Sequence, residues 1–350
     1  MTTIKISGRE IGPGHPPYVI AEMSGNHNGD LGRALSLIEA ASRAGADAVK
    51  LQTYTADTIT IDHDGPEFTI DGGLWAGRTL HELYDEAHTP WDWHPALFRR
   101  AAELGLTVFS SPFDDTAVDF LEELGVPAYK IASFELLDLP LVRRVAATRK
   151  PLIVSSGMAS EEEVGEALEA ARSAGANEIV LLHCVSGYPT PASEANLNMI
   201  TMLARRFAVP VGLSDHTLGT VVATAAVALG ACVIEKHFTL ARADGGPDAA
   251  FSLEPDELAE LAASCHMAWE ALGRSDFQRS PSEIENRRFR RSLYVVEDVA
   301  AGEAFTTRNT RSIRPGLGMA PKYLPDILGK IAAQPLKRGT ALQPQHIQDK

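Results

Sequence analysis

The chain has 350 residues, enough for one large domain or two ordinary ones, because single cores rarely grow past about 250–300 residues. Its 45% hydrophobic and 22% charged residues are typical of a globular protein and exclude disordered, collagen-like and disulfide-rich classes. Lys and Arg total 32 against 46 Asp and Glu, and the net charge of −14 argues against nucleic acid or an anionic membrane as a partner.

The cysteines and the N-terminus predict a cytoplasmic location. Cys184, Cys232 and Cys265 are odd in number and lie in apolar or helical contexts, so we expect buried thiols in a reducing compartment. No charged segment followed by an apolar stretch opens the chain, and no apolar run reaches about 18 residues.

In the first 240 residues or so, short β-branched runs alternate with Ala- and Leu-rich segments of helical period, several of which end in glycine. Eight strands are predicted, at Tyr18–Glu22, Ala48–Gln52, Thr107–Ser111, Ala128–Ser133, Leu152–Ser155, Glu178–His183, Val211–Ser214 and Val233–His237. The helices predicted between them include Leu31–Ala44, Thr116–Leu124, Glu161–Ala174 and Leu218–Leu229. This pattern predicts a (β/α)8 TIM barrel. A doubly wound sheet is the alternative, but no Gly-rich phosphate loop follows the first strand.

The segment Thr55–Trp93 is too long for an ordinary connection between a strand and a helix. It contains four glycines and three of the four tryptophans, Trp75, Trp91 and Trp93. Long loops in compact domains usually carry function, so we interpret this insertion as a lid. An insertion without a function is the alternative.

After the predicted helix Pro255–Leu272 the composition changes. Residues 274–291 are polar and rich in arginine, as expected for a linker. From residue 292 the patterns become short, at Ser292–Val296, Val299–Gly302, Thr310–Arg314 and Leu336–Leu342. We therefore predict a barrel domain over 1–273, a linker over 274–291 and a small domain over 292–350.

The ends of the predicted strands point to a functional site. In TIM barrels the active-site groups project from the C-terminal ends of the strands. Here all eight ends are polar or charged, while the strand bodies are mostly apolar. Core packing alone does not produce this distribution, so these ends predict an active site.

Part of this site has the chemistry of an anion cradle. Lysines and hydroxyls at the strand ends can bind a phosphate or a carboxylate. These residues are Lys50, Lys130, Ser111, Ser133, Ser155 and Ser214. The alternative is that each lysine pairs with Glu22, Glu135 or Glu235, which are also the candidate acid–base groups.

Two histidines end neighbouring strands and form a candidate metal site. The imidazoles of His216 and His237 can converge on one divalent ion, and manganese, iron, cobalt and zinc all suit such ligands. A single histidine is more often a core residue, and no CxxC or HExxH motif indicates a structural zinc. For His183 and Cys184 the sequence leaves structural and functional roles equally open.

Taken together, the motifs resemble the sialic acid synthase family over nearly the whole chain. In the barrel the resemblance is carried by Ile20–His27, Val49–Thr53, Tyr129–Ser133, Leu182–Cys184, Tyr188–Pro191, Gly212–Thr217 and Ile234–Phe238. The tail resembles that family's C-terminal antifreeze-like (SAF) domain at Ser292–Tyr294, Ser312–Gly316 and Leu328–Lys330. Within the family, the pseudaminic acid synthases are most similar, at Leu51–Asp57, Gly72–Trp75, Leu80–Tyr84, Thr89–Pro90 and Lys130–Glu135.

This resemblance implies a transferase of carbohydrate biosynthesis. It would condense phosphoenolpyruvate with 2,4-diacetamido-2,4,6-trideoxy-L-altrose and give pseudaminic acid and phosphate by carbon–oxygen cleavage. A divalent metal on His216 and His237, manganese with magnesium or cobalt as alternatives, would polarise the sugar aldehyde. Glu22 would activate a metal-held water.

The resemblance also implies roles for single residues. Those of the anion cradle would bind phosphoenolpyruvate, with Glu235 beside them, and Glu135, Tyr188 and Asp248 would face the sugar. Glu22 and Glu135 would act with the two histidines in catalysis. Arg314 would reach the site from the SAF domain of the partner chain in a domain-swapped homodimer.

A few positions depart from the pattern of the N-acetylneuraminate synthases. Phe134 stands where those enzymes carry glycine, which is consistent with a more apolar, 6-deoxy sugar, and Ser111 stands where they carry threonine. Ser186 and Gly187 replace a bulkier pair, which puts the shape of the acyl pocket in doubt.

Three other functions compete with this one. An N-acetylneuraminate or legionaminate synthase would run the same chemistry on another sugar. A metal-dependent sugar isomerase or aldolase would need no phosphate cradle. A catalytically inactive sugar-binding protein would not be expected to keep all the charged residues at the strand ends.

Overall fold

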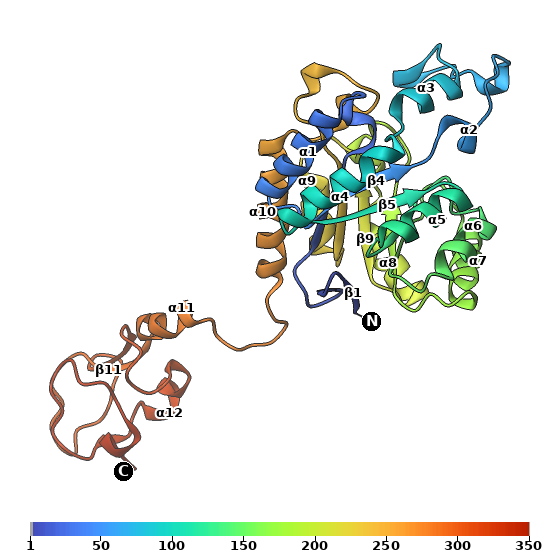
Figure 1. Cartoon of the computed structure of the whole chain (residues 1–350). Coiled ribbons are helices and arrows are strands. Elements are labelled where there is room, and N and C mark those ends of the chain that lie inside the picture. The colour runs from blue at the N-terminus through green and yellow to red at the C-terminus, as the bar shows by residue number, and fades with distance from the viewer. Residues whose placement is uncertain (1–2, 350) are drawn as a thin grey trace. The chain divides into compact units, whose positions relative to one another are not determined.

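The computed structural model describes residues 3–349 and divides into two units, residues 1–273 and 274–350. The first unit contains a closed barrel of parallel strands, in which β10 pairs with β3 and so closes the ring (Figure 1). The barrel strands are β3 (Tyr18–Glu22), β4 (Ala48–Thr53), β5 (Thr107–Pro112), β6 (Tyr129–Ile131), β7 (Leu152–Ser155), β8 (Ile179–Cys184), β9 (Val211–Asp215) and β10 (Val233–His237). The predicted TIM barrel is confirmed, and the doubly wound alternative is wrong because its sheet would stay open.

Helices form the outer layer of the barrel (Figure 1). They are α1 (Leu31–Arg43), α4 (His94–Glu103), α5 (Asp115–Leu124), α6 (Leu139–Ala146), α7 (Glu161–Ser173), α8 (Asn198–Phe207), α9 (Val221–Ala228) and α10 (Pro255–Leu272). Their ends follow local chemistry: a capping box of Ser160 and Glu163 starts α7, and Gly125, at φ 72°, ends α5.

Two predicted elements are shorter than expected by more than one residue, because their ends are used for loops at the barrel mouth. The strand predicted to run to Ser133 ends at Ile131, since the chain turns there and the Glu135 N–H donates to the Ala132 carbonyl at 3.2 Å. Likewise α9 begins at Val221 rather than Leu218, because the preceding residues belong to the loop after β9.

The interior of the barrel is apolar at one end and polar at the other. Side chains alternate between the inside and the helical layer along each strand. Apolar inward residues such as Ile20, Phe109 and Ile153 form a core with the side chains of an N-terminal hairpin, β1 (Ile4–Ile6) and β2 (Arg9–Ile11). This hairpin, which the sequence analysis did not anticipate, seals the end of the barrel opposite the site.

The insertion between β4 and α4 is folded rather than irregular. It contains the helix α2 (Ala56–Ile59), three single-turn segments η2 (Pro66–Phe68), η3 (Gly73–Trp75) and η4 (Trp91–Trp93), and the helix α3 (Leu80–Ala87). Figure 1 shows α2 and α3 at the end of the barrel opposite β1.

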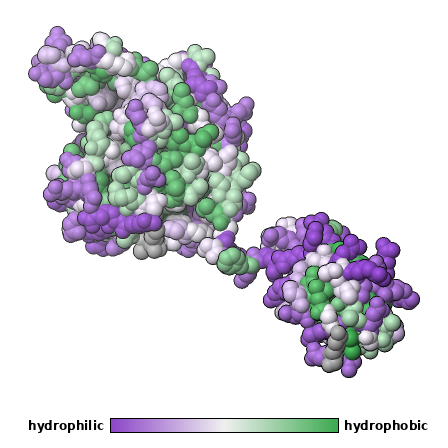
Figure 2. Space-filling view, turned by 180° about the vertical axis from the view of Figure 1, so that it is seen from behind, coloured by the Kyte–Doolittle hydropathy of each residue, from purple (hydrophilic) through white to green (hydrophobic). Residues whose placement is uncertain are grey.

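The second unit is built from short antiparallel pairs. β11 (Ser292–Val295) pairs with β12 (Thr310–Ile313), and β13 (Ile331–Ala332) pairs with β14 (Ile347–Gln348). The small core of this unit consists of Leu293, Val295, Val299, Phe305, Ile327, Ala332, Leu336 and Leu342. Its remaining helices are α11 (Pro281–Ile284), the single turn η8 (Glu285–Phe289), η9 (Pro321–Tyr323), α12 (Leu324–Ile327) and η10 (Pro344–His346). Figure 2 shows a mostly hydrophilic surface on this unit.

Two sequence expectations concern the linker and the tail. The predicted linker 274–291 contains ordered turns, since α11 and η8 lie within it. Leu336–Leu342 forms only isolated bridges, from Leu336 to Val299 and from Ala341 to Tyr294.

Two further features bear on the class of protein. Between residues 3 and 349 no helix combines the length and the apolar character needed to cross a membrane. Cys184, Cys232 and Cys265 are buried and form no disulfide, as predicted.

Candidate active site

A cavity of about 540 Å³ opens at the C-terminal ends of the barrel strands. It is lined by eleven of the fourteen side chains that the sequence analysis selected: Lys50, Lys130, Ser133, Glu135, Ser155, Tyr188, Ser214, His216, Glu235, His237 and Asp248. Glu22 and Ser111 are fully buried at strand ends and do not line it. Arg314 lies exposed in the second unit.

The floor of the cavity is a network of opposite charges. The Lys50 ammonium lies 2.7 Å from Glu22 Oε2 and 3.3 Å from Glu235 Oε1, and Lys130 Nζ lies 3.8 Å from the same Glu235 oxygen. The lysines of the predicted anion cradle are therefore paired with carboxylates, as in the alternative interpretation, and Glu235 is close to both of them. Burial lowers the pKa of Lys50 to about 8, although Glu235 counteracts this. Burial raises the pKa of Glu235, but the two lysines outweigh it and the net shift is downward.

Hydroxyl groups supply the remaining donors of the floor. Ser214 donates to Glu235 Oε1 at 3.0 Å, while the buried hydroxyls of Ser111 and Ser155 have no partner in the described chain. Buried polar groups are normally paired, so the unsatisfied hydroxyl of Ser155, which lines the cavity together with both lysines, indicates a missing acceptor. A phosphate or carboxylate oxygen fits this requirement.

The two histidines lie side by side, with ring centroids 5.4 Å apart. His216 Nδ1 lies 2.9 Å from the Val185 carbonyl, and the Cys184 thiol is a second hydrogen-bond partner of this ring. Burial lowers the pKa of His216, but Cys184 outweighs it and the net shift is upward. His237 Nδ1 is buried without a hydrogen-bond partner, 3.8 Å from an Asp248 oxygen. Burial, with the nearby His216 next in weight, holds the pKa of His237 well below its usual value, so this imidazole is neutral as a metal ligand must be.

These features fit a metal held by two imidazoles, although they form a sparse site. Among residues 3–349 no group of three or more His, Cys, Asp or Glu side chains is arranged to hold a metal ion. The other positions of such a metal would therefore fall to water or to a substrate.

Three residues surround the space above the floor. Burial raises the pKa of Glu135 to about 7, and its Oε2 is buried without a partner. The Tyr188 ring lies 4.4 Å from the His216 ring and 5.3 Å from the Phe251 ring. Burial raises the pKa of Asp248, while the Ser24 hydroxyl and the Gly25 N–H favour its carboxylate.

Some residues of the site were absent from the sequence-based set. Gln52 donates to Glu22 Oε1 at 3.2 Å and helps to orient it; its place at a strand end was the available signal. Trp75 and the apolar residues of the insertion also line the cavity, and only the length of that insertion pointed to them.

Two polar residues at the strand ends turn out to serve the scaffold. Lys236 points out of the barrel and pairs with Asp215 at 2.7 Å, with both side chains buried. His183 Nε2 lies 2.8 Å from the Ala195 carbonyl. This contact supports a structural rather than a functional role for His183. Cys184, in contrast, lines the cavity.

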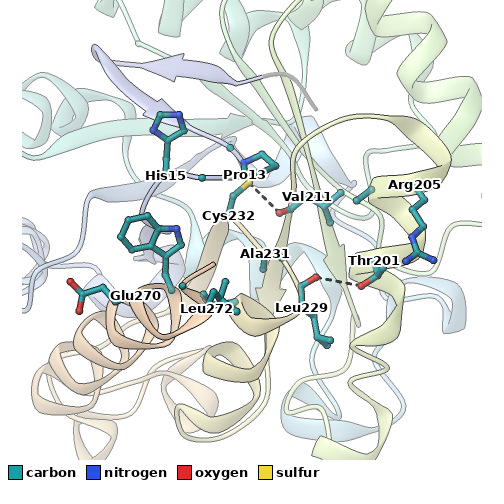
Figure 3. A pocket seen from close by; sticks show the side chains of 17 residues that line it. Pro13, His15, Thr201, Arg205, Val211, Leu229, Ala231, Cys232, Glu270 and Leu272 are labelled. Carbon is teal, nitrogen blue, oxygen red and sulfur yellow. Dashed lines mark hydrogen bonds between the residues drawn. The ribbon is translucent and has the colours of Figure 1, made fainter. Parts of the chain in front are cut away.

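A second cavity, of about 830 Å³, lies at the opposite end of the barrel, where β9 and β10 begin (Figure 3). Its labelled polar side chains are His15, Thr201, Arg205 and Glu270, among apolar residues such as Leu229 and Leu272. None of the residues selected from the sequence lines it, so its size does not make it the active site.

The fold and the floor define a TIM-barrel enzyme whose site is suited to an anionic substrate. The model of the NeuB family matches residues 37–277, and that of the SAF domain matches residues 290–348. The chain therefore belongs to the NeuB family, the sialic acid synthases.

Individual relatives agree with this assignment over almost the full length. A pseudaminic acid synthase of Campylobacter jejuni is 44% identical over 93% of this chain and 95% of its own. An N,N'-diacetyllegionaminic acid synthase of Legionella pneumophila is 37% identical over 95% of this chain and 94% of its own. The solved N-acetylneuraminic acid synthetase of Leptospira borgpetersenii, in complex with citrate, has a TM-score of 0.74 at 32% identity and covers 81% of this chain and 95% of its own.

Proposed function

We propose that this enzyme condenses phosphoenolpyruvate with 2,4-diacetamido-2,4,6-trideoxy-L-altrose to form pseudaminic acid and inorganic phosphate. The observation that carries the proposal is the floor of paired lysines and unsatisfied hydroxyls directly beside the two imidazoles. It provides an anion site and a carbonyl-polarising site within one cavity. The pseudaminic acid synthase of C. jejuni, 44% identical, supports this choice of sugar.

The floor would hold phosphoenolpyruvate through both of its anionic groups. Lys50 and Lys130 would neutralise its charge, and Ser111, Ser155 and Ser214 would donate to its oxygens. Ser133, whose hydroxyl lies 2.9 Å from that of Ser186, is a further donor at the edge.

The chemistry then forms one carbon–carbon bond and one carbon–oxygen bond to water, and breaks the carbon–oxygen bond to phosphate. A divalent metal on His216 and His237, for which we propose manganese with magnesium or cobalt as alternatives, would supply Lewis-acid polarisation of the sugar aldehyde. The methylene carbon attacks the aldehyde carbon, the carbonyl electron pair moves to the aldehyde oxygen, which takes up a proton and becomes a hydroxyl, and an oxocarbenium ion is left at the enol carbon. Water adds to that carbon, and phosphate departs with the bridging oxygen.

For the proton of the attacking water we propose Glu22 as the acceptor. It is fully buried at the end of β3, and its oxygens are held by Gln52 and the Lys50 ammonium. On the sugar side, Glu135, Tyr188 and Asp248 would bind the hydroxyl and amide groups of the open chain.

We further propose a cytoplasmic, domain-swapped homodimer, in which Arg314 of one chain completes the site of the other. The exposed guanidinium of Arg314 in the second unit and the free cysteines support this proposal.

The test measures phosphate release from phosphoenolpyruvate with added manganese, and compares the diacetamido-trideoxy-altrose with N-acetylmannosamine and the legionaminic acid precursor. Release with the altrose sugar alone is the expected result. Release only with another sugar would assign the synthase to that acceptor, for which the Legionella relative is a precedent. No release with any sugar would favour an isomerase, an aldolase or a sugar-binding protein.

A matched pair of variants tests the metal site. His216→Ala should abolish manganese binding measured by calorimetry as well as turnover, whereas His183→Ala removes a buried imidazole that does not line the cavity and should leave manganese binding intact. Full turnover by His216→Ala would remove the metal assignment.

A further inference from the structure

The cavity has two walls of opposite chemistry. Its floor, at the strand ends, consists of charged and hydroxyl-bearing residues, as described above. Its roof comes from the insertion after β4 and is almost entirely apolar. The roof is formed by Ile59, Ile70, Trp75, Leu80, Leu83 and Tyr84.

The roof is fastened to the rest of the site by Trp75. Its indole N–H donates to the Pro247 carbonyl at 2.7 Å, and its ring centroid lies 5.7 Å from that of Tyr188. Pro247 directly precedes Asp248, which faces His237 across 3.8 Å. The contact therefore joins the insertion to the segment after β10 that positions a residue of the site.

The local backbone explains why Trp75 reaches this far. The insertion narrows to a small hairpin, in which the Ile70 N–H donates to the Arg78 carbonyl at 2.9 Å and the Gly77 N–H to the Ile70 carbonyl at 2.8 Å. Gly73 and Gly77 at its tip have φ of 77° and 85°, a conformation that favours glycine. Trp75 lies between these two glycines and is thus carried at the tip.

We propose that this roof is a binding subsite for the apolar end of the sugar, and that Trp75 is the positioning and specificity residue that holds it in place. This inference rests on the proposed function. The imidazoles mark the aldehyde end of the open-chain sugar, so the opposite end of the chain extends away from the floor. A terminal methyl group packs against leucine, isoleucine and indole, whereas a terminal hydroxyl would lose its water there without gaining a partner.

The size of the expected discrimination follows from the same argument. A hydrophobic pocket distinguishes ligands that differ by one small group by roughly 10- to 100-fold. The roof should therefore favour a 6-deoxy acceptor over the same sugar with a 6-hydroxyl group by about that factor.

The experiment compares three variants with the full-length enzyme. Trp75→Ala removes both the ring and the N–H, and Trp75→Phe keeps a ring but removes the donor. Trp91→Phe is the matched control, because Trp91 belongs to the same insertion and donates its indole N–H to the Tyr54 carbonyl at 3.2 Å but does not line the cavity.

We expect Trp75→Ala to raise KM for the sugar by about tenfold or more, with KM for phosphoenolpyruvate changed less than about twofold. Trp75→Phe should show a smaller increase, and Trp91→Phe should leave both constants unchanged. In Trp75→Ala the ratio of kcat/KM for the 6-deoxy sugar to kcat/KM for the same sugar with a 6-hydroxyl group should fall towards one. Equal effects of Trp75→Phe and Trp91→Phe on the sugar, or equal losses for both substrates in Trp75→Ala, would overturn the proposal.

An equilibrium readout separates this proposal from the proposed function. Sugar binding alone should change the tryptophan fluorescence of the enzyme, and Trp75→Phe should remove that change while Trp91→Phe keeps it. If the enzyme released no phosphate but showed this fluorescence pattern, the proposed reaction would be contradicted and the proposed sugar subsite would be supported. A fluorescence change that persists in Trp75→Phe would contradict the subsite even in an active enzyme.

Discussion

The charged residues at the barrel mouth are arranged so that most of them neutralise one another before any substrate binds. Glu235 lies between Lys50 and Lys130 and also accepts from Ser214, while the buried hydroxyls of Ser111 and Ser155 have no partner in the described chain. Both buried ammonium groups of the site therefore have a carboxylate partner, and an incoming anion still finds hydrogen-bond donors there. Because distant surface charges are screened, the net charge of −14 does not exclude an anionic substrate here.

The pKa of Glu135, raised to about 7 by burial, predicts a pH dependence. The group is neutral below that pH and a carboxylate above it. If the carboxylate accepts a hydrogen bond from the sugar, kcat/KM for the sugar should rise with pH through about 7. Glu135→Gln should lower kcat/KM several-fold and remove this rise. A pH profile of phosphate release that keeps its rise in the variant would contradict this role.

The buried pair of Asp215 and Lys236 predicts a large effect on stability. Asp215→Ala would leave Lys236, whose side chain is 0% exposed, without its carboxylate partner and with only the Thr217 carbonyl as an acceptor in the described chain. Loss of one member of a buried pair costs about 3–5 kcal/mol. Asp349→Ala, which breaks the exposed pair with Lys330, should leave stability unchanged. Denaturant unfolding monitored for each unit checks both expectations, and a loss below about 1 kcal/mol for Asp215→Ala would mean that Lys236 finds water.

At the scale of elements, the two ends of the barrel have separate tasks. The hairpin of β1 and β2 closes one end with apolar side chains, and the insertion covers the other end, where the charged residues lie. Stability and binding should therefore respond to mutations at different ends.

The hairpin provides the test of this separation. Ile6 is 0% exposed in the core beneath the barrel, so Ile6→Ala should destabilise the first unit by about 2–5 kcal/mol. KM for both substrates should stay unchanged, since the cavity lies at the other end. Lys5→Ala, on the exposed side of the same strand, should change stability by less than about 0.5 kcal/mol. Thermal unfolding and steady-state kinetics check this, and an altered KM in Ile6→Ala would show that the two ends are coupled.

At the scale of the whole molecule, the proposal that matters is the exchange of the SAF unit between chains. It predicts complementation between two inactive variants, Lys50→Ala in the barrel and Arg314→Ala in the SAF unit. In a swapped heterodimer one site combines an intact barrel with an intact Arg314, and the other site combines both lesions. Mixing after reversible dissociation should thus restore about a quarter of wild-type activity. If each chain completes its own site, the mixture will stay inactive.

Much of the fold could be predicted because each barrel strand has a recognisable sequence pattern. The strands at Tyr18–Glu22, Leu152–Ser155 and Val233–His237 have the bounds expected from their apolar, β-branched runs. Parallel strands buried on both faces have this pattern, and helices of period 3.6 between them leave few other topologies. The hairpin at Ile4–Ile11 was not anticipated, because two three-residue strands carry too short a pattern.

Residue types and their order along the chain thus determined the barrel, the end at which the site lies and most of the polar residues that line it. Only the tertiary structure decided how those residues pair. Lys50 and Glu235 are 185 positions apart and Trp75 and Pro247 are 172 apart, so no local pattern can report either contact. The closure of the barrel brings the first pair together, and the fold of the insertion brings the second. Adjacent strand-end residues, such as Glu235 and Lys236, face opposite sides of the barrel wall, so one serves the site and the other the scaffold.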